Sequence, residues 1–161
     1  MTIGYDPKRI TPEKLAKLIT DLGFKAEEVE PPGAGTGAGA KKHQRVKAPM
    51  PDDAPKFFRE AFDQARRANH PVVIDFWAKW CPPCLQLKEV TFRDPKVAGL
   101  LEKVQLIYVD LDKYPALGKA YGVQAIPDLF LVDRKGWIAD RLQDFEPPDA
   151  FFVRLRTLLA E

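Results

Sequence analysis

Residues 71–78, PVVIDFWA, place the strongest constraint on the fold of this chain. Apart from Asp75 the run is apolar, which is typical of a strand buried on both faces, because a half-exposed strand would alternate apolar and polar residues. Such a strand needs helices on both sides of its sheet. The run therefore predicts an α/β domain with a helix-covered central sheet.

The segments around this run alternate between helical and strand patterns. Apolar residues at helical spacing over 57–65 predict a helix before it. The expected later elements are helices at 82–90, 94–104, 114–121 and 147–159, and strands at 105–112, 127–133 and 136–142. The order βα, βα, ββα predicts a mixed sheet, since helical crossovers join parallel strands and a short turn joins antiparallel ones.

The N-terminal part of the chain has a different pattern. Leu15, Leu18, Ile19 and Leu22 lie at helical spacing, so a strand-helix segment is expected within residues 1–30. Pro, Gly, Ala and charged residues then replace apolar periodicity over 31–53, which predicts a flexible linker. The folded domain is expected at 54–161.

Charge and hydropathy indicate no nucleic-acid or membrane partner. The chain has 25 basic and 23 acidic residues and a net charge of +2, too balanced for a nucleic-acid or membrane surface. No stretch approaches the length of an apolar membrane span, and the first residues lack a signal-peptide pattern. We expect a monomer that is cytoplasmic as written, or periplasmic or membrane-associated if the natural chain is longer.

Both cysteines of the chain lie in the sequence CPPC, directly after the predicted buried strand. A helix start favours an anion at Cys81, and the thiolate is the nucleophilic form of cysteine. Lowering a thiol pKa from about 8.5 to about 7 raises the ionised fraction at neutral pH from roughly 3% to half. Cys84 follows about one helical turn later, close enough to attack a mixed disulfide on Cys81.

Three other interpretations of the pair stay open. A structural disulfide closing so short a loop would contribute roughly 2 kcal/mol. A metal site needs four ligands, whereas His43 and His70 lie far from the pair. Two buried inert thiols are less consistent with the neighbouring Lys79 and prolines.

The sequence resembles the thioredoxin superfamily over about residues 54–160. DFWAKWCPPC repeats the strand, tryptophan and active-site turn of that family, and YGVQAIP supplies its cis-proline loop. The segment TFRDPKV after the cysteines resembles the C-terminal domain of the interchange protein DsbD. The resemblance implies a thioredoxin fold and thiol–disulfide exchange.

The resemblance also implies roles for individual residues. Cys81 corresponds to the attacking thiol and Cys84 to the buried resolving thiol, with Asp75 as the acid that moves a proton on or off Cys84. Asp75 could instead be an ordinary strand-edge residue.

Three further residues correspond to the substrate-binding part of the family's site. Pro127 matches the cis-proline, Ile126 offers its backbone to an extended substrate, and Trp80 matches the exposed flanking ring. Trp77 is more simply explained as core. Asp128 and Asp144 replace the usual threonine and glycine, and two added carboxylates are expected to repel acidic partners.

The N-terminal segment resembles the second half of a heavy-metal-associated domain, ending in LGFKA, without its cysteine-bearing half. We therefore predict no metal binding. The segment is either a truncated start or a free amphipathic helix.

We predict a thiol–disulfide oxidoreductase that reduces protein disulfides, with a redox-active Cys81–Cys84 disulfide and no cofactor. Its expected partners are protein disulfide substrates and an electron-donating reductase or membrane thiol carrier. The alternatives are a non-catalytic binding module and an oxidant or isomerase of exported proteins.

Overall fold

The computed structural model describes residues 46–161. The predictions for residues 1–30, and for the first part of the predicted linker, lie outside the described residues. No described helix is both long and apolar enough to cross a membrane.

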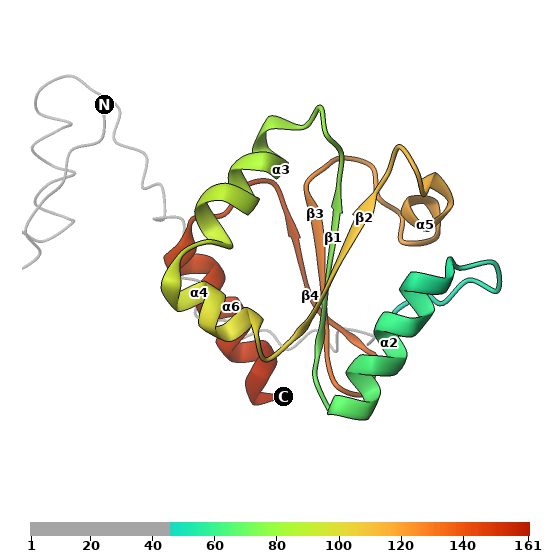
Figure 1. Ribbon diagram of the computed structural model, residues 1–161, viewed down its shortest axis with the longest axis horizontal. Helices are drawn as coiled ribbons and strands as arrows, with labels where there is room; N and C mark the ends of the chain where they lie inside the picture. Colours follow the sequence, from blue (N-terminus) through green and yellow to red (C-terminus); the bar gives the residue numbers. More distant parts are fainter. Residues whose placement is uncertain (1–45) are drawn as a thin grey trace, which may run out of the picture. The chain divides into compact units, whose positions relative to one another are not determined.

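A four-stranded mixed sheet forms the centre of the domain (Figure 1). The strands are β1 (Val72–Trp77), β2 (Gln105–Asp110), β3 (Asp128–Val132) and β4 (Ile138–Gln143), in the order β2-β1-β3-β4. β1 pairs parallel with β2 and antiparallel with β3, and β3 and β4 form an antiparallel hairpin. The predicted mixed sheet is confirmed.

Helices cover both faces of this sheet (Figure 1). One face carries α3 (Pro82–Gln86), a π-helical turn η1 (Leu87–Thr91), α4 (Pro95–Leu101) and α6 (Pro148–Ala160). The other face carries α2 (Lys56–Ala68) and α5 (Pro115–Ala120). The helix expected at 82–90 is present, but it changes from α to π geometry after Gln86.

The central strand β1 is buried on both faces, as its apolar run predicts. Ile74 and Phe76 pack into the core beneath α2 and α5, whereas Val73 packs into the core beneath α4 and α6. Because side chains alternate along a strand, Asp75 lies on the same face as Val73. The acid therefore faces the layer that contains α3 and η1.

The last residues of the predicted linker pair with the β3–β4 hairpin. Lys47 and Trp137 form an antiparallel bridge, Val46 O accepts a hydrogen bond from Ile138 N, and Ala48 N donates one to Gly136 O. These bonds attach the chain to the domain before the predicted domain boundary at residue 54.

Candidate active site

The two cysteines form a disulfide at the point where the chain leaves β1 and enters α3. Their sulfur atoms are 2.01 Å apart and their Cα atoms 5.3 Å apart. Cys84 is completely buried, whereas Cys81 keeps a small exposed area. An incoming thiol or disulfide therefore reaches Cys81 before Cys84.

Cys81 is the N-cap residue of α3. Its Sγ accepts a hydrogen bond from Cys84 N at 3.3 Å. Pro82 and Pro83 occupy the first two helical positions and have no N–H group. A thiolate on Cys81 would therefore receive one backbone N–H from this turn, fewer than a helix start without prolines offers.

The loop before β3 lies against the disulfide. The Ile126–Pro127 peptide bond is cis, as the resemblance implies. Ile126 O lies 3.6 Å from Cys81 Sγ, although the two residues are 45 positions apart in the sequence. Trp80 flanks the pair on the surface, 67% exposed, and its indole Nε1 donates to Asp112 Oδ1 at 3.1 Å.

Asp75 is fully buried, and neither of its carboxylate oxygens accepts a hydrogen bond from the described residues. Burial raises the pKa of Asp75 from its ordinary 3.8 to about 7, an effect that the positive charge of Lys88 opposes. A carboxyl group with a pKa near neutrality can accept and release a proton under physiological conditions. The strand-edge alternative does not describe this residue, because Asp75 lies inside the sheet between Tyr108 and Leu129.

Lys88 is a residue that sequence reasoning missed. Its ammonium lies 3.9 Å from Asp75 Oδ2, 3.0 Å from the centre of a Trp77 ring and 4.3 Å from that of Tyr108. The pKa of Lys88 is lowered overall, chiefly by burial, although the negative charges of Asp75 and Asp110 raise it. The available signal was its position four residues after Cys84, which places both side chains on one helix face.

The same geometry changes the interpretation of Trp77. This side chain is only partly buried, and it lies against the Lys88 ammonium on the face of the sheet that Asp75 shares. Trp77 is therefore part of the surroundings of the buried acid, and an assignment to the core alone is incomplete.

Asp128 does not add a free carboxylate beside Pro127, contrary to expectation. It is fully buried, and Arg141 binds both of its oxygens, with Nε at 2.9 Å and Nη2 at 2.5 Å. Arg141 also donates to Gly122 O at 3.2 Å, near the start of the loop that carries Pro127. Arg141 therefore neutralises the charge of Asp128 and ties this loop to β4.

Asp144 is the added carboxylate that remains exposed. Its backbone has a φ of 85°, a left-handed conformation that is uncommon for residues other than glycine. Its N–H donates to Pro127 O at 3.1 Å, so its backbone lies directly beside the cis-proline. The expected repulsion of acidic partners therefore rests on Asp144 alone.

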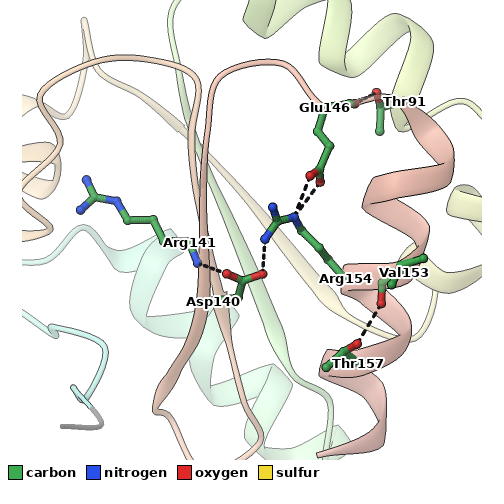
Figure 2. A network of polar contacts seen from close by, with 7 residues as sticks. All are labelled: Thr91, Asp140, Arg141, Glu146, Val153, Arg154 and Thr157. Atoms are coloured by element: carbon green, nitrogen blue, oxygen red, sulfur yellow. Dashed lines mark hydrogen bonds and ion pairs between the residues drawn. The ribbon is translucent and has the colours of Figure 1, made fainter. Parts of the chain in front are cut away.

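An arginine of α6 fixes the loop that follows Asp144 (Figure 2). Arg154 lies between Glu146 and Asp140, with Nε 2.9 and 2.8 Å from the two Glu146 oxygens and Nη1 2.5 Å from Asp140 Oδ2. Thr91, at the end of η1, donates to Glu146 O at 2.6 Å. These bonds join β4, α6 and η1.

One hollow of the described domain lies away from the cysteines. Its volume is about 450 Å³, and it is lined by residues of α2, the start of β1 and the end of β3, including Phe62, Val72 and Val132. Cys81 follows the opposite end of β1. Among residues 46–161, no group of three or more His, Cys, Asp or Glu side chains could hold a metal ion.

Comparison with known proteins agrees with this geometry. The thioredoxin family model matches residues 54–154. A thioredoxin-like protein of Synechocystis is 36% identical over 61 residues, which cover 38% of this chain and 56% of that protein. This chain spans 53–59% of the length of the first curated relatives that it matches.

Two solved structures share the fold, and the match covers more of their length than it does of these curated relatives. The reduced C-terminal domain of Neisseria meningitidis DsbD is 27% identical, with a TM-score of 0.56, over 63% of this chain and 94% of that one. A thioredoxin from Thermus thermophilus is 28% identical, with a TM-score of 0.57, over 63% and 83%. The likeness to DsbD and the thioredoxin fold are both confirmed, and the chain belongs to the thioredoxin family.

Proposed function

We propose that this protein is a thiol–disulfide oxidoreductase that reduces disulfides in other proteins. The observation that carries the proposal is the Cys81–Cys84 disulfide at the start of α3, with Ile126 O 3.6 Å from the outer sulfur. A backbone oxygen beside the reactive sulfur can align an extended polypeptide by strand-like hydrogen bonds. The redox group consists of the chain's own cysteines, so the exchange needs no added cofactor.

The reaction proceeds in two exchanges. The Cys81 thiolate attacks a substrate disulfide, the S–S bond breaks, and one substrate sulfur leaves as a thiolate while the other stays bonded to Cys81. Cys84 then gives its proton to Asp75 and attacks Sγ of Cys81, so that the second substrate sulfur leaves as a thiolate. Two electrons pass from the cysteine pair to the substrate, and a reductase or membrane thiol carrier restores them.

The direction of exchange follows from the stability of the Cys81 thiolate. Strong oxidants of this type owe their potential to a stabilised reduced form. Here two prolines remove backbone N–H donors from the start of α3 and add no charge. We therefore expect a reduction potential near −270 mV, as for thioredoxin.

Two measurements test the proposal. Equilibration in dithiothreitol buffers, with alkylated thiols counted by mass, gives the potential; a value of about −120 to −180 mV would instead indicate an oxidant or isomerase of exported proteins. Cys81→Ser should abolish reduction of insulin disulfides, whereas Cys84→Ser should accumulate mixed disulfides. Full activity of the Cys81 variant would show that the roles are wrongly assigned.

A further inference from the structure

The charges around Asp75 are arranged by an unusual turn of the helix that carries the cysteines. η1 is a π-helical turn that begins at Leu87, directly after α3. π-Turns are rare and occur often at functional sites. Lys88 lies in this turn, and its side chain reaches back to the buried acid on β1.

The Lys88 ammonium is fixed by two rings as well as by the carboxylate. Trp77 on β1 and Tyr108 on β2 each present a ring to Nζ, at 3.0 and 4.3 Å. Attraction between a cation and an aromatic ring favours this position without neutralising the charge. The ammonium is therefore held near Asp75, where a free lysine side chain would extend into solvent.

Few other charges act on this pair. Asp75 is paired in the sheet with Tyr108 on β2 and with Leu129 on β3, and Lys88 is the charged group that acts on it from η1. Asp110 acts on Lys88 from the end of β2. Burial drives Asp75 towards its neutral form, and Lys88 is the described cation that opposes this effect.

We propose that Lys88 is a positioning residue for the second exchange step, because its ammonium, held between two rings, increases the fraction of Asp75 that is ionised at neutral pH and can take the proton of Cys84. The inference rests on the proposed function. The proton moves from Cys84 Sγ to a carboxylate oxygen of Asp75, and the resulting thiolate attacks Cys81 Sγ. Lys88 exchanges no proton or electron in this step.

The two steps can be measured separately with dithiobis(nitrobenzoate), which releases a coloured thiolate at each exchange. Reduced protein releases the first equivalent when Cys81 attacks and the second when Cys84 resolves the mixed disulfide. Both releases are followed by stopped-flow absorbance between pH 5 and 9. The test compares Lys88→Met, which removes the charge, with Lys88→Arg, which keeps it.

Removing an opposite charge this close raises a carboxyl pKa by roughly one unit or more. In Lys88→Met the second release should therefore be about fivefold slower at pH 7 and its pH midpoint about one unit higher, for a one-unit shift. The first release should change less than twofold, and Lys88→Arg should restore both properties of the second. Lys79→Met is the matched control: Lys79 is exposed beside Cys81, and its loss should leave the second release unchanged.

An independent readout avoids dependence on turnover. The Asp75 carboxyl of the oxidised protein can be titrated by carbon-13 NMR in wild type and in both Lys88 variants, with thermal melting to verify folding. The midpoint should rise in Lys88→Met and not in Lys88→Arg. Unchanged midpoints and an unchanged second release would overturn the role of Lys88, whereas failure of the wild type to release a second equivalent would overturn the proposed function itself.

Discussion

At the scale of single residues, the environment of Asp75 links proton binding to stability. Its pKa is raised from 3.8 to about 7 in the folded protein, chiefly by burial. Between pH 3.8 and about 7, Asp75 is therefore protonated in the folded state but ionised in the unfolded chain. The contribution of Asp75 to stability is therefore greatest below about pH 4 and falls as the pH rises to 7, by up to roughly 4 kcal/mol.

Replacing Asp75 by asparagine should remove this loss. Asp75→Asn and the wild type should have similar unfolding free energies at pH 4, where the acid is neutral, whereas the variant should be a few kcal/mol more stable at pH 8. Urea unfolding of the oxidised proteins at both pH values measures the difference. A difference that is constant across this range would contradict the raised pKa.

At the scale of elements, we expect the start of α3 to influence the reduction potential of the cysteine pair. Pro83 occupies a position whose N–H often binds an N-cap side chain. Pro83→Ala adds that donor, and a hydrogen bond to a charged group is worth about 1.5–3 kcal/mol. The reduction potential should therefore rise by about 30–60 mV.

The reduction potentials of the wild type and Pro83→Ala are measured by equilibration with glutathione or dithiothreitol, and Pro95→Ala serves as the control. Pro95 is the first residue of α4, as Pro82 is of α3, but that helix carries no cysteine, so the Pro95 variant should keep the wild-type potential. An unchanged potential in Pro83→Ala would mean that the missing N–H groups do not set the direction of exchange.

The elements also differ in how far they could be predicted. The strands and most helices follow from local apolar spacing, and β1 is buried on both faces as expected. The change from α3 to η1 was not predicted, because an apolar pattern with Leu85 and Leu87 fits either helical geometry. The bridge at Lys47 was missed because the Pro- and Gly-rich segment before it carries no strand signal.

At the scale of the whole molecule, the redox state should change global stability. Closing the short CPPC loop stabilises the folded protein by roughly 2 kcal/mol in the chain-entropy treatment. If no strong interaction stabilises the Cys81 thiolate, the oxidised protein should be more stable than the reduced one by about this amount. Urea unfolding with and without dithiothreitol tests this, with the Cys81→Ser/Cys84→Ser double variant as the control that should not respond. A reduced form more stable than the oxidised form would indicate an oxidant.

The sequence alone determined the features that depend on local order. The apolar run at 71–78 fixed a strand with helices on both sides, and the CPPC spacing placed two thiols one turn apart at a helix start. The family motifs identified Pro127 as well, and the structure confirms its cis bond.

The tertiary structure decided which side chains meet across the fold. It placed Ile126 O beside Cys81, neutralised Asp128 with Arg141 and brought Lys88 to Asp75. Spacing in the sequence places Lys88 on the helix face of Cys84 at most, and it could not show these three contacts, because each depends on the register between strands or on the geometry of a turn. A single residue of register, or one π-turn in place of an α-turn, changes which face a charged side chain occupies.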